Sequence, residues 1–197
     1  MTALSWMAQA AGLFVVTNID DIIVLSLFYA QGAGLPNTTR KILLGQYLGF
    51  GAILLAAVAV ALSARALLPE SAVAYFGLLP LVLGVRAAWL AWRDRDDADD
   101  DEVGGLSVLT IAAVTFANGG DNIGVYVPVF LRAGPSGTAV YTVVFLLLVA
   151  VLVVAARFVA TRPLVARLLE RWESVLFPLV LIVLGMVILV EGGAFGL

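Results

Sequence analysis

The stretch Thr17-Asn18-Ile19-Asp20-Asp21-Ile22 decides how this chain folds, because its Asn-x-x-Asp pattern recurs one hundred residues later in Asn118-Gly119-Gly120-Asp121-Asn122. Each copy lies in the middle of an apolar stretch long enough to cross a lipid bilayer. A charged side chain at the centre of a spanning helix costs roughly 2.5–3.5 kcal/mol, so such residues are rare there and usually face a bundle interior or an ion pathway. The repeat therefore predicts a function inside the membrane.

The composition agrees with this prediction. Hydrophobic residues make up 62% of the chain and charged residues 13%, whereas soluble domains are about 45–50% apolar. Apolar runs cover residues 4–29, 42–62, 72–92, 106–131, 138–156 and 175–195. Each approaches or exceeds the roughly 20 residues that a spanning helix needs, so we expect six transmembrane helices. The fifth run is the shortest, and it can extend to Ala160 if the Arg157 side chain snorkels toward water.

The residue types that the chain lacks exclude several functions. The sequence contains no cysteine and no histidine, which rules out disulfides, thiolate or imidazole metal ligands and histidine proton relays. We find no arrangement of nucleophile and base, so we expect neither an enzyme nor a bound cofactor. The net charge of −3 reflects one short acidic segment, and nothing in the sequence supports binding to nucleic acid.

That acidic segment divides the chain. Residues 94–105 read as a solvated cytoplasmic linker between a first three-helix repeat, residues 1–93, and a second, residues 106–197. Because each repeat has an odd number of spanning helices, the second must enter the membrane the other way up. We therefore expect an all-α integral membrane protein with an inverted repeat of three plus three helices.

Basic residues predict the orientation of this bundle. The first, third and fifth loops contain Arg40, Lys41, Arg93, Arg95, Arg157, Arg162, Arg167 and Arg171, whereas the second and fourth contain Arg65 and Arg132. Since basic residues in short loops stay in the cytoplasm, the odd-numbered loops are expected inside and both termini outside. Residues 161–173 form either a short interfacial helix or a solvated extension of a neighbouring span.

The repeated motif suggests a site. Residues three apart share a helix face, so Asn18 with Asp21, and Asn118 with Asp121, each present an amide and a carboxylate in one direction. A pseudo-two-fold axis in the membrane plane would join the two pairs in an oxygen cage at the bilayer midplane, and oxygen ligands suit hard divalent ions. The candidate ligands are Asn18, Asp20, Asp21, Asn118, Asp121 and Asn122.

Asp20 and Asn122 can join such a cage only where the helix is broken, because each lies about 100° around the helix axis from its neighbour. Gly119 and Gly120 predict such a break in the fourth span, between Asn118 and Asn122. The first span has no glycine near its motif, so we expect it to be continuous.

The free-energy cost of these charged residues in a membrane favours a functional site over their chance occurrence. Three ionised carboxylates facing lipid would cost on the order of 8–10 kcal/mol, so they must be buried, protonated or neutralised by a cation. Metal arrival would then release a proton, and proton arrival would help to expel the metal. The alternative is that these residues only join helices by hydrogen bonds, although that role requires neither charge nor a repeated spacing.

Three further polar residues have less specific interpretations. Arg86 either snorkels toward the cytoplasm or pairs with a site carboxylate. Gln46 lies on a glycine-rich face of the second span that indicates close helix packing, with a role in the inner path as the alternative. Glu191, near the outer end of the sixth span, reads as a solvated carboxylate or as part of an exit path.

Four motifs resemble those of the cadmium resistance transporter family (CadD-like), within the lysine exporter superfamily. They are Thr17-Asn18-Ile19-Asp20-Asp21-Ile22, Gly45-Gln46-Tyr47-Leu48-Gly49-Phe50, Gly77-Leu78-Leu79-Pro80 with Leu83-Gly84, and Asn118-Gly119-Gly120-Asp121-Asn122-Ile123-Gly124-Val125-Tyr126-Val127-Pro128. The resemblance implies a bacterial plasma-membrane exporter of cadmium or a related divalent ion, with a lysine-exporter-like fold and protons as the coupling ion. Oxygen ligands by themselves favour magnesium, calcium or manganese.

Two other functions stay open at this point. In an exporter of cationic amino acids, the carboxylates would pair with an ammonium group. In a membrane scaffold that transports nothing, the acidic third loop or the basic fifth loop would recruit partners. The sequence also leaves the oligomeric state open, a homodimer included.

Overall fold

The computed structural model describes residues 3–67, 74–93, 107–162, 178–179 and 182–190, and all regular structure in these ranges is helical. The helices are α1 (Ala3–Thr17), α2 (Ile19–Gln31), α3 (Thr38–Leu67), the 3-10 turn η1 (Ala74–Gly77), α5 (Leu78–Arg93), α6 (Val108–Asn118) and α7 (Gly120–Ala160), followed by helical residues 182–190. This confirms the all-α class. The predicted linker at 94–105, most of residues 161–173 and Glu191 lie outside the described residues.

Within the described ranges, α3 with 30 residues and α7 with 41 residues are long and apolar enough to cross a membrane. The pair α1 and α2 is a third span if it is counted as one, and α6 is apolar but shorter. These helices agree with a membrane protein. The complete set of six spans and the three-plus-three repeat stay predictions.

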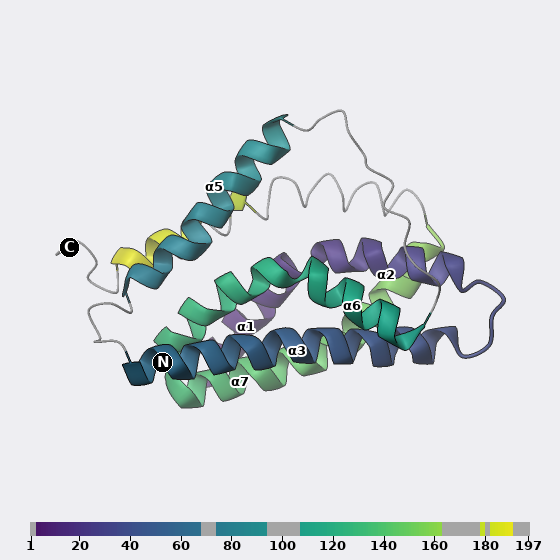
Figure 1. Ribbon diagram of the computed structural model, residues 1–197, viewed down its shortest axis with the longest axis horizontal. Helices are drawn as coiled ribbons and strands as arrows, with labels where there is room; N and C mark the ends of the chain where they lie inside the picture. The colour runs from purple at the N-terminus through teal and green to yellow at the C-terminus, as the bar shows by residue number, and fades with distance from the viewer. Residues whose placement is uncertain (1–2, 68–73, 94–106, 163–177, 180–181, 191–197) are drawn as a thin grey trace.

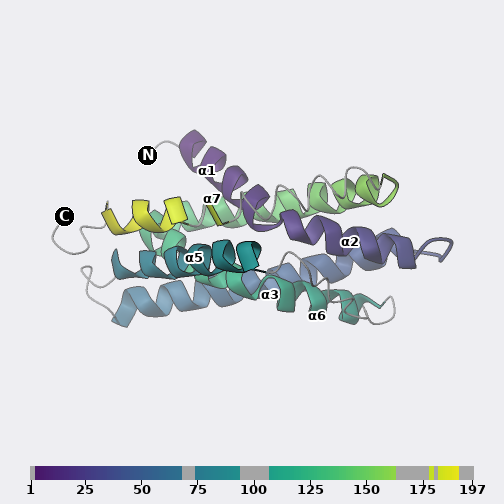
Figure 2. The same ribbon diagram turned by 90° about the horizontal axis from the view of Figure 1, so that it is seen from above.

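The first span is broken, so the expectation of a continuous helix is wrong. Asn18 has the backbone angles φ −130° and ψ 21°, and the axes of α1 and α2 differ by 56°. Figure 2 shows α1 turning away from the line of α2. The fourth span is broken as predicted, because α6 ends at Asn118 and α7 begins at Gly120.

A further interruption lies inside α7. Gly134 has φ +71° and ψ 179°, a conformation that glycine adopts without steric cost, and Pro135 follows it without a backbone N–H. The stretch after Gly134 corresponds to the predicted fifth span. The helix continues to Ala160, the residue to which this span could extend, while the snorkelling of Arg157 stays a prediction.

Helix α3 packs along both α6 and α7, while α1 and α2 pack against α7. In Figure 1, α3 and α7 run side by side along the molecule. Aromatic rings fill the space between these helices: Phe14, Phe50, Tyr126, Phe130, Tyr141 and Phe145. Such buried, edge-on ring contacts stabilise the core on which the polar site is built.

The contact between α3 and α6 depends on two glycines. A Cβ at Gly45 would lie 2.6 Å from the Ile111 side chain, and one at Gly49 would lie 2.6 Å from the carbonyl oxygen of Ala112. No side chain fits into these distances, so only glycine allows the two backbones to approach so closely. The close packing predicted from the glycine-rich face is therefore confirmed.

Candidate metal site at two helix breaks

Two helix breaks, at Asn18 and Gly119, position the polar residues of the site. At the first break, polar side chains bond to the preceding turn: Thr17 Oγ1 donates to the carbonyl oxygen of Leu13 at 3.0 Å, and Asn18 Nδ2 to that of Phe14 at 2.8 Å. Such bonds compete with the helical pattern. Asp20 and Asp21 then lie in the first turn of α2, and Asp121 in the first turn of α7, where the helix dipole favours negative charge.

The two copies of the motif meet through Asn118. Its Nδ2 donates to Asp20 Oδ2 and to Asp21 Oδ1, both at 2.8 Å. Asp21 is only 3% exposed. One amide from the second half of the chain therefore bridges both carboxylates of the first half.

Asp21 has a second partner that the sequence analysis missed. Gln46 Nε2 donates to Asp21 Oδ2 at 2.8 Å, and Gln46 Oε1 accepts from Thr115 Oγ1 at 2.6 Å. Gln46, Asp21 and Thr115 are all buried. The sequence analysis favoured packing for Gln46 and kept a role in the inner path as the alternative, but it did not predict a bond to Asp21. The available signal was a polar residue on the glycine-rich face that contacts a neighbouring helix.

Asn18 and Asn122 each bury an amide oxygen that has no hydrogen-bond partner among the described residues. Asn18 is fully buried and Asn122 is 3% exposed. Asn18 also donates to Tyr126 Oη at 3.2 Å, and Thr17 Oγ1 lies 2.8 Å from the same hydroxyl. Buried acceptors are almost always paired, so two orphaned oxygens, one near each break, fit cation ligands.

Asp121 lies apart from this hydrogen-bonded cluster. Its side chain is exposed and lines a cavity of about 600 Å³. Phe76, Leu79 and Leu83 are among its other lining residues. Asp121 nevertheless lies within electrostatic reach of Asp20 and Asp21. At the break in the second half of the chain, the Asn122 side chain is buried, whereas the Asp121 side chain is exposed.

The structure therefore differs from the expected cage in which Asp21 and Asp121 share one point. Among the residues that the structure describes, no three acidic, histidine or cysteine side chains lie close enough together to hold a metal ion. The charged oxygens that the structure brings together are those of the Asp20 and Asp21 carboxylates, which share the Asn118 amide as donor. Such oxygens suit a hard divalent cation.

A family model for the cadmium resistance transporter matches residues 14–197. The chain belongs to this family. No curated protein and no solved structure matched it. Membership in the cadmium resistance transporter family, together with the long apolar helices, indicates a membrane protein that transports metal ions.

The match to the cadmium resistance transporter family spans both helix breaks, Gln46 and Thr115. The side chains of Asp20, Asp21 and Asn118 converge in a hydrogen-bonded bridge, whereas Asn18 bonds to Phe14, Thr17 and Tyr126. Arg86 lies within electrostatic reach of Asp121, which agrees with the reading that pairs it with a site carboxylate.

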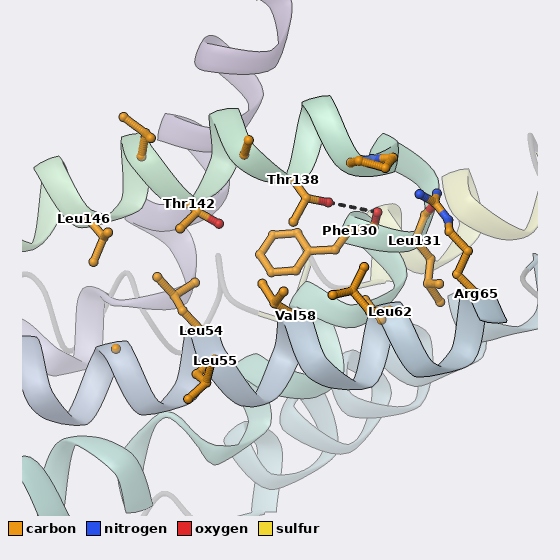
Figure 3. A pocket seen from close by; sticks show the side chains of 15 residues that line it. Leu54, Leu55, Val58, Leu62, Arg65, Phe130, Leu131, Thr138, Thr142 and Leu146 are labelled. Carbon is orange, nitrogen blue, oxygen red and sulfur yellow. Dashed lines mark hydrogen bonds between the residues drawn. The ribbon is translucent and has the colours of Figure 1, made fainter. Parts of the chain in front are cut away.

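This member of the cadmium resistance transporter family has another cavity, away from Asp121. It measures about 620 Å³ and lies between α3 and α7. Figure 3 shows its apolar lining, with Thr138 donating to the carbonyl oxygen of Phe130 at 3.2 Å and Arg65 at one end, next to Leu131. Arg65 donates to the carbonyl oxygen of Leu131. None of the described residues that line this cavity is acidic, so they offer a cation no charged ligand.

Proposed function

We propose that the protein exports a divalent metal cation, cadmium or a related ion, from the cytoplasm in exchange for protons. The observation that carries this proposal is the bridge at the helix breaks, where Asn118 joins the half-buried carboxylate of Asp20 to the buried carboxylate of Asp21. Among the described residues, neither carboxylate has a basic hydrogen-bond partner, and such groups are costly inside a bilayer unless a cation or protons neutralise them.

The cargo ligands in this proposal are Asp20 and Asp21, with the orphaned oxygens of Asn18 and Asn122 as neutral ligands. The Asn118 N–H groups occupy the carboxylate oxygens in the metal-free protein. An arriving cation replaces these N–H groups and neutralises the carboxylates, and Asn118 then turns its own oxygen toward the ion. Because the carboxylates can pair with either the cation or the Asn118 amide, the site can alternate between a cation-bound and a cation-free state.

Alternating access uses the two halves of the chain as an inverted repeat. Asp21 is buried while Asp121 faces a cavity, so the two copies of the motif have different environments. Asp121 joins the cation when the halves rock past each other, and the cavity beside it then serves as one route to the site. This motion agrees with transporters whose broken helices meet at the repeat interface.

Protons couple to transport because they compete with the metal for the same oxygens. A carboxylate that holds a cation must be deprotonated, so metal binding releases protons and proton binding releases metal. The oxygen ligands bind a soft ion such as cadmium only moderately. Moderate binding suits an exporter, which must release its cargo on the far side.

The test uses purified protein in liposomes with a metal-sensitive dye inside. We expect an imposed proton gradient to drive cadmium movement, and Asp21→Asn to abolish it, because the amide removes the buried negative charge. Tyr47→Phe serves as the control, since Tyr47 bonds to the carbonyl oxygen of Leu146 and not to the site. Normal transport by Asp21→Asn would falsify the site.

The same liposomes separate the other candidate functions. Counterflow of lysine in place of cadmium would indicate an exporter of cationic amino acids. If no divalent ion moves under any proton gradient, the scaffold role is favoured and the transport proposal fails.

A further inference from the structure

Gln46 links two helices and a carboxylate in the interior of the bundle. It is 0% exposed. Its amide nitrogen lies 2.8 Å from Asp21 Oδ2, and its amide oxygen lies 2.6 Å from Thr115 Oγ1. The result is a relay of hydrogen bonds that runs from α6 through α3 to the first turn of α2.

The close approach of α3 to α6 makes this relay possible. Gly45 precedes Gln46, and Gly49 lies one turn later on the same face, where a Cβ would stand 2.7 Å from the Thr115 Cβ. With the two backbones this close, a side chain as long as glutamine spans from Thr115 to Asp21. The glycines thus place a polar side chain between two neighbours that are far apart in sequence.

Thr115 holds the other end of the Gln46 amide. The hydroxyl of Thr115 donates to Gln46 Oε1, and the ionised carboxylate of Asp21 can only accept. The amide nitrogen must therefore face Asp21. Because Asn118 donates to the other oxygen of Asp21, both oxygens of this carboxylate are held, one from α3 and one from α6.

In the described part of the second half, the positions that correspond to Gln46 and Thr115 do not form such a relay. One hundred residues after Gln46 the sequence has Leu146, and one hundred residues before Thr115 it has Val15. Neither side chain can form a hydrogen bond. Asp121, the counterpart of Asp21, is exposed beside a cavity, so only one of the two repeated aspartates is fixed in place.

We infer that Gln46, oriented by Thr115, is a positioning residue that holds the Asp21 carboxylate for the metal cation and sets the affinity of the site. The inference rests on the proposed function and deepens it. Hydrogen bonds that orient a ligating carboxylate restrict its rotation, so losing them weakens metal binding without removing a ligand. Asp21 is then the fixed ligand, and Asp121 is the ligand that joins when the halves move.

The test compares Gln46→Met, which keeps the length of the side chain without its hydrogen bonds, with Tyr47→Phe as a control on the neighbouring residue. We expect Gln46→Met to raise the KM for cadmium in liposomes about 10–100-fold with kcat within about twofold, because binding and not translocation is weakened. The concentration of cadmium that raises the Tm of the purified protein should shift by the same factor. Tyr47→Phe should change neither quantity.

Thr115 provides the second arm. Thr115→Val should raise the KM in the same direction, and Thr115→Ser, which keeps the hydroxyl, should restore it. If Thr115 acts through Gln46, adding Thr115→Val to Gln46→Met changes nothing further. If Gln46→Met fails to fold, the comparison of Thr115→Val with Thr115→Ser decides, because the relay is intact only in the serine variant.

The outcomes separate this inference from the proposed function. An unchanged KM in Gln46→Met, or in Thr115→Val, with an inactive Asp21→Asn would overturn the positioning role and leave the transport site standing. Additive effects of the two changes would also overturn it, since the residues would then act independently. Normal cadmium transport by Asp21→Asn would instead remove the site on which the inference rests.

Discussion

At the scale of single residues, the site is built from groups that lower the stability of the protein when no ligand is bound. The side-chain amide oxygens of Asn18 and Asn122 are buried without partners among the described residues. An unsatisfied buried acceptor costs about 1–3 kcal/mol. Asp21 adds a buried carboxylate. Groups of this kind persist in a fold where a ligand completes them, and the loss of stability is recovered when the ligand binds.

Asn122→Leu tests this account. Since leucine has a similar size and no orphaned acceptor, we expect the free energy of unfolding of the metal-free protein to stay equal or rise, while stabilisation by cadmium falls. Thermal unfolding with and without cadmium measures both. Ser26→Ala is the control, because Ser26 is buried but bonds within α2 to the carbonyl oxygen of Ile23. Equal metal stabilisation in Asn122→Leu and the unchanged protein would exclude Asn122 as a ligand.

Asp121→Asn is expected to abolish transport with little change in the stability of the protein. The Asp121 side chain is exposed, so we expect the substitution to change the free energy of unfolding by no more than about 0.5 kcal/mol. Cadmium efflux should nevertheless be abolished, because the second carboxylate no longer joins the cation. Membrane insertion and efflux are measured in the same cells. Cells that carry Asp121→Asn and still resist cadmium would show that Asp121 has no part in the site.

At the scale of helices, the breaks and the glycine contact act together. The break at Asn18 exposes Asp20 and Asp21 to Asn118, and the contact between α3 and α6 carries Gln46 into the same region. The fixed distance between α3 and α6 thus determines the geometry around Asp21. A change in that distance should disturb the site even though neither glycine touches it.

Gly49→Ala tests this dependence, with Gly51→Ala as the matched control. A Cβ at Gly49 would lie 2.6 Å from a backbone oxygen, whereas a Cβ at Gly51 meets nothing within 4 Å. We expect Gly49→Ala to lower the free energy of unfolding by about 1–3 kcal/mol and to weaken cadmium binding. Gly51→Ala should be neutral or slightly stabilising. Similar Tm values for the two variants would contradict the close contact.

At the scale of the whole molecule, the outer faces of the long helices are apolar. Leu55 on α3 is 72% exposed and Val154 on α7 is 69% exposed, as expected for helix faces that contact lipid. The polar groups of the site lie inside the bundle. This arrangement is the reverse of a soluble protein and agrees with a transport path through the interior.

The cysteine-free sequence makes the predicted orientation easy to test. A single cysteine at Leu35, in the first loop, should react with a membrane-impermeant maleimide only after cells are permeabilised. A cysteine at Ser136, beyond the Gly134 interruption, should react in intact cells. Both positions are exposed. The opposite labelling pattern would mean that the termini face the cytoplasm.

Much of the site follows from local sequence. The apolar runs predict a helical membrane protein, and the repeated Asn-x-x-Asp pattern identifies the carboxylates at its centre. The break at Gly119 was predictable because glycine weakens a helix through its own backbone freedom. The break at Asn18 was not, since it depends on side chains that bond to the preceding turn and to Tyr126.

The chain's own sequence determined the class of protein, the position of its charged groups and the symmetry of its motif, because hydrophobicity and residue spacing are local properties. Only the tertiary structure decided that Asn118 bridges Asp20 and Asp21 and that Gln46 bonds to Asp21. It also decided that Asp121 lies apart from them and lines a cavity. These pairings join residues from different helices. They depend on the packing distance and rotation of those helices, which the spacing within one helix does not contain.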